Sequence, residues 1–130
     1  MKRRELVKFQ SDEYLAQYAK AIAADQKWAE STKGLKTSLK TTTTDTGQSY
    51  LLSVENGVTT MQKATSETPA EFSFESTYEG WSKVARGEMD MQSAILKGQV
   101  HFKGSLTKLL MHRRTLNRLA ELMQEIPKEF

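Results

Sequence analysis

The hydrophobic positions near the start of the chain follow the repeat of an amphipathic helix. Tyr14, Tyr18 and Ile22 recur at four-residue intervals, and Ser11 precedes them at a position suited to an N-cap. The pattern predicts a helix that begins after Ser11 and runs towards Trp28. Beyond this helix, the spacing of apolar residues changes from that of a helix to that of a strand.

Alternating apolar and polar residues predict a run of β-strands in the middle of the chain. The predicted strands cover residues 35–43, 50–54, 58–64 and 72–75. Asn56 and Gly57 favour a tight hairpin turn between the second and third strands. In the fourth strand, Phe72 and Phe74 share one face and their polar neighbours share the other.

Two short helices and one further strand are expected after the fourth strand. Ser76 and Glu79 have the spacing of a capping box, which predicts a helix that ends at Gly87. A second short helix is predicted over residues 91–97. The clean alternation of residues 99–103 then predicts a fifth strand, with Val100 and Phe102 pointing inward and His101 and Lys103 pointing outward.

The final helix is the most clearly amphipathic segment of the chain. Its apolar stripe consists of Leu109, Leu116, Leu119, Ala120, Met123 and Ile126. His112 and Arg113 interrupt this stripe, and we expect both side chains to point outward from a slightly bent helix that Pro127 ends. Strands grouped together and helices kept apart from them predict an α+β fold, formed as a single domain over residues 1–130.

Composition and charge exclude several functional classes. The chain has 130 residues, no cysteine and a formal net charge of +3, so disulfides, thiolate nucleophiles and cysteine-ligated metals are excluded. Basic residues cluster at positions 2–4 and 112–114, but acidic residues are interleaved with them. These clusters are either solvated helix faces or contacts for an anionic surface. No segment has the length and apolarity of a membrane span, and we expect a cytoplasmic protein.

The sequence offers no arrangement of residues that is typical of catalysis. Neither of the two histidines, His101 and His112, has a metal-ligand partner one helical turn away, so we expect no metal site. There is no nucleophile elbow and no glycine-rich phosphate loop. The carboxylate pairs lie at predicted helix starts, where such residues act as caps. We therefore expect neither enzymatic activity nor a bound cofactor.

Apolar residues are crowded between the fourth strand and the last helix. They are Phe72, Phe74, Trp81, Met89, Met91, Ile95, Leu96, Val100 and Phe102. An ordinary solid core would give the same composition. The alternative is that part of this set lines a cavity, where flexible methionine side chains could repack around ligands of different shape.

The order of residues in this region resembles one known family. Residues 72–81 read Phe-Ser-Phe-Glu-Ser-Thr-Tyr-Glu-Gly-Trp, and residues 85–98 carry glycine, acidic residue, alanine and glycine in sequence. Val100, Phe102, Gly104 and Ser105 complete the pattern, which is similar to that of the sterol carrier protein-2 family. Ser105 stands where an Asp is common in that family. Residues 31–126 would form the shared core, and residues 1–30 an additional basic leader and helix.

The resemblance implies a five-stranded, mainly antiparallel, twisted sheet covered by helices that enclose an apolar tunnel. It implies non-catalytic binding and transfer of fatty acids, fatty acyl-CoA esters, sterol-like or isoprenoid lipids. The expected tunnel residues are Phe72, Phe74, Trp81, Met91, Ile95, Leu96, Val100, Phe102, Leu106 and Leu110. We expect His112 and Arg113 at the tunnel mouth, facing an anionic head group.

Two other functions are compatible with the sequence. The same fold could be an accessory subunit that presents a lipid or quinone precursor to a partner enzyme, with the basic N-terminus and the last helix as docking surface. Transient contact with a membrane surface fits both functions. Nucleic-acid binding through Arg113, Arg114 and Arg118 is disfavoured, because aromatic residues are not interleaved with these cations.

Overall fold

The computed structural model describes residues 6–130 of the chain. Its centre is a five-stranded sheet in the order β4-β3-β2-β5-β6. The strands are β2 (Thr37–Thr43), β3 (Gln48–Glu55), β4 (Val58–Ala64), β5 (Phe72–Ser76) and β6 (His101–Lys103). β2 and β5 run parallel, whereas the other neighbouring pairs are antiparallel. The predicted α+β fold with a mainly antiparallel sheet is confirmed.

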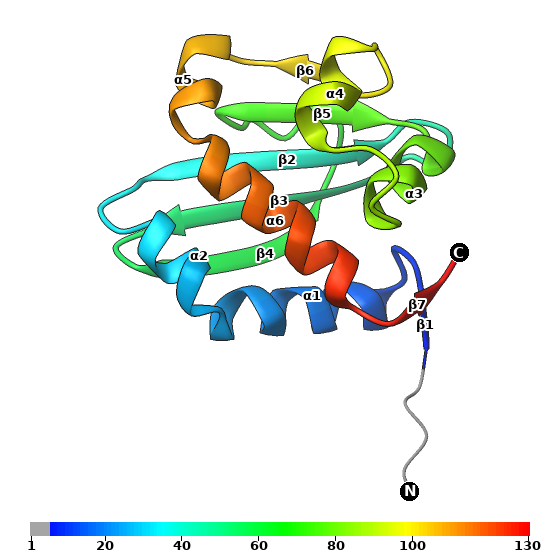
Figure 1. Cartoon of the computed structure of the whole chain (residues 1–130), viewed down its shortest axis with the longest axis horizontal. Helices are drawn as coiled ribbons and strands as arrows, with labels where there is room; N and C mark the ends of the chain where they lie inside the picture. Colours follow the sequence, from blue (N-terminus) through cyan, green and yellow to red (C-terminus); the bar gives the residue numbers. More distant parts are fainter. Residues whose placement is uncertain (1–5) are drawn as a thin grey trace, which may run out of the picture.

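Helices cover one face of this sheet (Figure 1). The helices are α1 (Asp12–Ala24), α2 (Gln26–Ser31), α3 (Tyr78–Ala85), α4 (Met91–Leu96), α5 (Leu106–Met111) and α6 (Arg113–Glu125). α6 crosses the sheet diagonally, and α1 lies along the edge formed by β4 (Figure 1). On the opposite face, Lys40 donates hydrogen bonds to the carbonyl oxygens of Ser66, at 2.6 Å, and Thr68, at 2.8 Å. These bonds hold the β4–β5 connection against the sheet.

Two helices that the periodicity predicts as continuous are each divided in two. Asp25 has extended backbone angles and ends α1, and its carboxylate accepts a hydrogen bond of 2.7 Å from the Trp28 amide at the start of α2. His112 separates α5 from α6. A one-residue break preserves the apolar stripe on both sides of it, so the predicted stripe is confirmed and the predicted single bent helix is wrong.

The predicted capping box before α3 is also wrong. Thr77, not Ser76, is the N-cap, and its hydroxyl accepts a hydrogen bond of 3.1 Å from the Gly80 amide. Ser76 belongs to β5 and donates its own hydroxyl to the carbonyl oxygen of Gln99 at 2.6 Å. The side chain of Ser76 therefore joins β5 to the segment before β6.

The described ends of the chain meet in a small parallel pair that the sequence pattern does not predict. β1 (Val7–Lys8) pairs with β7 (Lys128–Glu129), which brings the two described ends of the chain to one side of the molecule (Figure 1). The ring of Phe9 packs against Tyr14, Tyr78 and Phe130, with centroid distances between 5.1 and 5.6 Å. This aromatic contact fixes the C-terminus beside the start of α1.

Candidate functional site

A narrow apolar cavity lies between the covered face of the sheet and α6. Its volume is about 40 Å³. The residues around it are Tyr18, Leu39, Thr41, Tyr50, Leu52, Met61, Phe74, Trp81, Met91, Leu116, Leu119, Ala120 and Met123. This space is much smaller than the open tunnel expected from the sequence.

The register of the strands explains why these residues face one another. Leu39 pairs with Leu52, and Thr41 pairs with Tyr50, so the side chains of β2 and β3 form two successive rows on the covered face. On β5, Phe74 lies beside Thr41. α6 lies over these rows with its apolar stripe, in which Ala120 is the smallest side chain and leaves space beneath the helix.

One wall of the cavity carries hydroxyl groups. The Tyr18 hydroxyl donates a hydrogen bond of 3.0 Å to the carbonyl oxygen of Leu119 on α6. Thr41 and Tyr50 line the cavity from the sheet, and burial raises the pKa of Tyr50 to about 12. These tyrosine hydroxyls therefore remain protonated at neutral pH and can donate hydrogen bonds.

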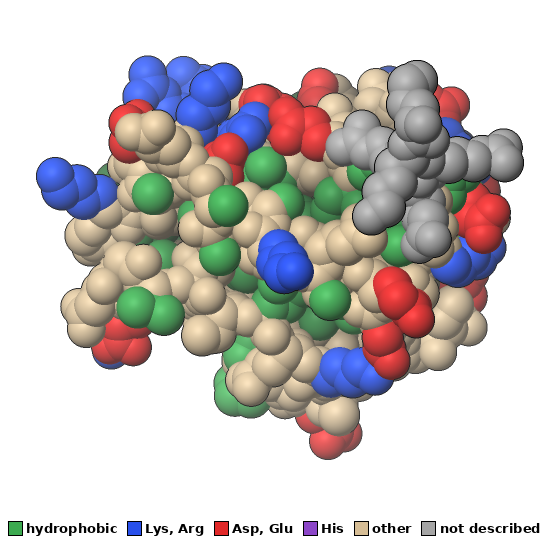
Figure 2. All heavy atoms as spheres, turned by 90° about the horizontal axis from the view of Figure 1, so that it is seen from below, with side chains coloured by type: hydrophobic (Ala, Val, Ile, Leu, Met, Phe, Trp, Pro, Cys, Tyr) green, Lys and Arg blue, Asp and Glu red, His purple; other side chains and the backbone are tan. Residues whose placement is uncertain are grey.

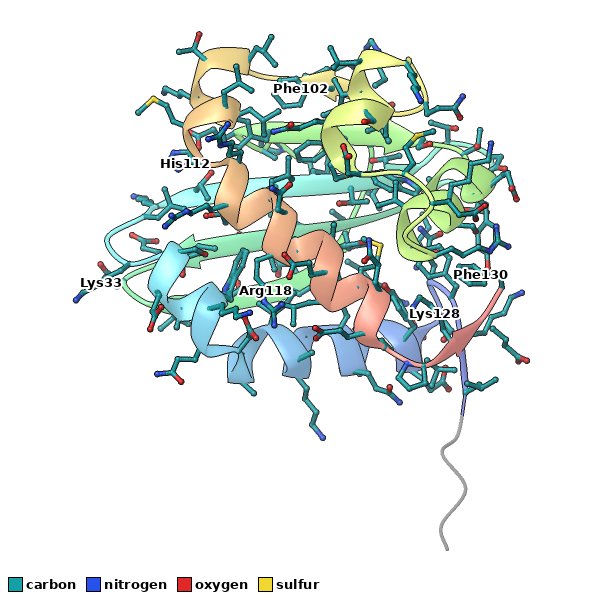
Figure 3. All side chains as sticks on the ribbon, in the orientation of Figure 1. Lys33, Phe102, His112, Arg118, Lys128 and Phe130 are labelled. Carbon is teal, nitrogen blue, oxygen red and sulfur yellow. The ribbon has the colours of Figure 1, made fainter. Side chains whose placement is uncertain are left out.

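Two further hollows lie between the cavity and the surface near the α5–α6 break, and neighbouring hollows share lining residues. A second, smaller space of about 10 Å³ shares Leu39 and Leu116 with the main cavity. This second space shares His112 and Thr115 with a surface hollow of about 490 Å³, which Arg113 and Arg114 also line together with Glu30. We call the space of about 10 Å³ the neck and the surface hollow the basic hollow; His112, at the α5–α6 break (Figure 3), lines both.

The hollow has favourable electrostatics for an anion. α6 begins there, and no side chain caps its first turn through a hydrogen bond. The first amide groups of a helix lack intrahelical partners and carry a partial positive charge. The exposed Arg113 and Arg114 add full charges beside them. Glu30 opposes this field from α2.

The structure brings together only part of the predicted tunnel residues. Phe74, Trp81 and Met91 line the main cavity, and Phe72 lines the neck. Ile95, Val100 and Phe102 belong to the surrounding core; the Phe102 ring lies 5.5 Å from that of Phe74 and 6.1 Å from that of Phe72. His112, Arg113 and Leu110 line the surface hollow.

Two predicted tunnel residues point away from the interior. Leu96 is 87% exposed and Leu106 is 56% exposed. Both lie on short helices that bury only one side: α4 buries Met91 and Ala94, and α5 buries Leu109. The assignment of Leu96 and Leu106 to the lining was therefore wrong. Leu110 is 53% exposed and belongs to the hollow, not to the interior.

Several lining residues were not predicted as part of the site. Tyr18 was assigned to the apolar side of the first helix, and Tyr50 and Leu52 to one face of the second strand. The signal available in the sequence was their periodicity, which marks an inward side chain but not what it faces. The α6 residues Leu116, Leu119, Ala120 and Met123 were likewise predicted only as part of the apolar stripe of the last helix.

Charged side chains on the face carrying α1 are mixed in sign. Figure 2 shows Lys and Arg side chains on this face interspersed with acidic and apolar ones. Within residues 6–130, no three acidic or histidine side chains gather in a way that could hold a metal ion. None of the helices in that range is both long and apolar enough to cross a membrane. The basic cluster at residues 2–4 lies outside the described residues.

Comparison with known proteins assigns the chain to a family. Residues 19–130 match the family described as alkyl sulfatase C-terminal. The chain belongs to the alkyl sulfatase C-terminal family. This domain also has the fold of sterol carrier proteins: a crystal structure of sterol carrier protein 2 superposes with a TM-score of 0.80 at 16% identity, over 92% of this chain and 99% of the other.

Two further structures place this alkyl sulfatase C-terminal domain among its relatives. The inverting sec-alkylsulfatase Pisa1 from Pseudomonas sp. is 24% identical with a TM-score of 0.54; the match covers 68% of this chain but 14% of the sulfatase. Sterol carrier protein 2 from Aedes aegypti, in complex with the C16 fatty acid palmitate, is 14% identical with a TM-score of 0.57, over 85% of this chain and 94% of that one. No curated protein sequence matches the chain.

Proposed function

We propose that this protein binds single-chain anionic amphiphiles without chemical conversion, with fatty acids and alkyl sulfates as the ligand class. The observation that carries this proposal is a series of three neighbouring hollows that share lining residues: the apolar cavity, the neck at His112 and the basic hollow beside Arg113. The tail would lie beneath α6, and the anionic head would lie at the exposed start of that helix. Palmitate binding by the Aedes aegypti relative and the sulfatase family match support this ligand class.

The size of the cavity requires that the tail open it. A volume of about 40 Å³ holds only a few water molecules, whereas sites for small ligands usually measure about 300–1,000 Å³. The lining is suited to rearrangement, because Met61, Met91 and Met123 contribute flexible side chains to it. A tail of twelve carbons would gain on the order of 10 kcal/mol from burial, and part of this gain would be used to displace α6.

A blocking variant tests the location of the tail. Ala120→Leu adds bulk beneath α6, and we expect it to weaken palmitate binding at least tenfold, measured through the fluorescence of Trp81 in the cavity wall. Ala29→Leu makes the same change on the exposed side of α2 and is the matched control. Equal affinity of palmitate for the wild type and for a folded Ala120→Leu variant would refute the assignment.

A second variant tests the location of the head group. Arg113→Ala should weaken palmitate by about fivefold, the size expected for an exposed charge, and should leave hexadecanol unaffected. The same loss for the acid and the alcohol would show that Arg113 does not meet the head group.

The family match also favours a second function, in which the protein presents a bound chain to an enzyme. The sulfatase relative carries the corresponding domain as a small part of a longer chain. A stable partner that copurifies with the full chain and is lost on deletion of residues 1–10 would support this function over free transport.

A further inference from the structure

Three of the six large hydrophobic side chains that are exposed in the described part of the chain lie on α5. They are Leu106, Leu110 and Met111, of which Met111 is 74% exposed. Leu106 and Leu110 are four residues apart and share one side of the helix, and Met111 follows directly. Leu109 is the one buried residue of α5. Isolated exposed leucines are common on protein surfaces, but their concentration in one six-residue helix indicates a contact surface.

The segment that contains α5 is strongly basic. Residues 91–120 include no Asp or Glu and six basic residues: Lys97, Lys103, Lys108, Arg113, Arg114 and Arg118. The remaining thirteen basic residues are outnumbered by the sixteen acidic ones, so the rest of the chain is net negative. Acidic side chains of other elements approach this segment: Glu71 lies 3.9 Å from Lys108, Glu75 lies 3.3 Å from Lys103, and Glu30 lines the basic hollow. Because exposed ion pairs contribute little, the positive charge remains available to an anionic surface.

The apolar side chains of α5 are continuous with the basic hollow. Leu110 and Met111 line that hollow together with Arg113 and Arg114, and His112 lines both the hollow and the neck. α5 lies at the corner of the molecule opposite β1 and β7 (Figure 1). A surface that contacts α5 would therefore also face the hollow where we place the head group of an anionic amphiphile.

We propose that α5 and the start of α6 dock on the surface of a lipid bilayer that contains anionic phospholipids. The three exposed apolar side chains of α5 enter the boundary between head groups and acyl chains, and Lys108, Arg113 and Arg114 contact the phosphate and carboxylate groups.

The size of this surface favours a bilayer over a protein partner. A stable protein interface buries about 800 Å² on each side, and three side chains on a short helix cannot supply its apolar centre. Bilayer binding needs only a small apolar area supported by cations. The inference deepens the proposed function, and rests on it for one point only, that the docked surface is where the amphiphile passes between bilayer and protein.

The test measures sedimentation of the full chain with lipid vesicles. The wild type should bind vesicles of phosphatidylcholine and phosphatidylserine in equal parts, and should bind less at high salt or with phosphatidylcholine alone. Leu106→Gln combined with Met111→Gln should lower the partition constant for the anionic vesicles by about tenfold or more. Arg114→Gln should lower it about fivefold, the effect of one cation near an anionic surface. Val58→Gln is the matched control, because Val58 is 61% exposed but lies on β4, at the sheet edge opposite β6 and α5.

Fluorescence quenching by brominated phosphatidylcholine in the anionic vesicles locates the docked surface. Trp28 and Trp81 are each 2% exposed, so quenching reports on a tryptophan added at the surface. We expect strong quenching in Met111→Trp and none in Val58→Trp. The reverse result would overturn the assignment to α5.

Palmitate binding measured without vesicles separates this inference from the proposed function. A protein that binds palmitate but not the anionic vesicles overturns the docking surface alone, whereas one that binds the vesicles through α5 but not palmitate supports the docking surface and contradicts the proposed function. Equal vesicle binding by the wild type and the folded double variant also overturns the inference. So does a copurifying protein that the double variant loses while the wild type fails to bind vesicles, since α5 would then contact a protein.

Discussion

Replacing Asp25 with alanine should loosen the attachment of α6, the roof of the cavity. The Asp25 carboxylate caps α2 through the Trp28 amide and also receives two hydrogen bonds from Arg118 on α6, from Nε at 2.8 Å and from Nη2 at 2.5 Å. Both charged side chains are only 13% exposed. Arg118 thus reaches from the roof to the junction of α1 and α2 (Figure 3).

The expected loss of stability follows from these two roles. Loss of an N-cap costs about 1 kcal/mol. Removing one partner of a fully buried ion pair costs about 3–5 kcal/mol, and the remaining exposure of both side chains reduces this to about 2 kcal/mol. We expect Asp25→Ala to lower the free energy of unfolding by about 3 kcal/mol, which corresponds to roughly 10 °C in Tm. Asp25→Asn keeps an N-cap acceptor and should lose about 2 kcal/mol.

The pH dependence of stability gives an independent check on the ion pair. The hydrogen bond from Arg118 is the main cause that holds the pKa of Asp25 below its ordinary value of 3.8. Because the folded-state pKa is lowered, the stabilisation is complete above the unfolded-state pKa and is lost as pH falls through the folded-state pKa. The stability difference between wild type and Asp25→Asn should therefore be constant near neutral pH and shrink below about pH 4.

Urea unfolding followed by tryptophan fluorescence measures these differences, and hydrogen exchange locates them. Exchange in α6 should accelerate more than exchange in β2 and β3 in the Asp25 variants. Glu55→Gln is the control, because its partner Lys36 is 79% exposed and the pair contributes less than about 1 kcal/mol. Loss of stability in Asp25→Ala no larger than in Glu55→Gln would refute the role given to the ion pair.

Two other substitutions test the packing around the site. Gly80→Ala should lower the free energy of unfolding by about 1–3 kcal/mol, measured by urea unfolding, because the added Cβ would lie 2.0 Å from the Ser76 hydroxyl oxygen and disrupt its hydrogen bond to Gln99. If the double variant with Ser76→Ala does not recover part of this loss, the clash with Ser76 is not its cause. Leu96→Gln should leave both stability and palmitate affinity within error of wild type, since Leu96 is 87% exposed; a marked loss of affinity in a binding titration would return Leu96 to the site.

The sheet could be predicted from the sequence because apolar residues recur at alternate positions of its strands. Leu52 and Phe74 face the core as their positions in the alternation require. The helix breaks at Asp25 and His112 could not be predicted in the same way, since the apolar stripe continues in phase across each break. The β1–β7 pair joins two-residue strands from opposite ends of the chain, and so short a segment carries no periodicity.

The location of the cavity depended on geometry that no local pattern contains. The sequence correctly placed Trp81 and Met91 in the interior, but it grouped them with Leu96 and Leu106, which lie on the outer sides of short helices. Periodicity separates inward from outward residues only over several turns, and α4 and α5 are each about one and a half turns long. Residues in such helices can be assigned to a site only after the helices are placed.

The cavity itself results from the position of α6 over the sheet. The break at His112 allows α6 to take a direction independent of α5, and its stripe then brings the small Ala120 to the cavity that Thr41 lines from the sheet. A solid core would require a larger side chain in place of Ala120. Leaving a cavity of about 40 Å³ lowers the free energy of unfolding by about 1 kcal/mol, at 24 cal/mol per Å³. The fold thus stays closed at little expense. Under the proposed function, an entering tail must therefore open the roof itself, because the closed space is too small to receive it.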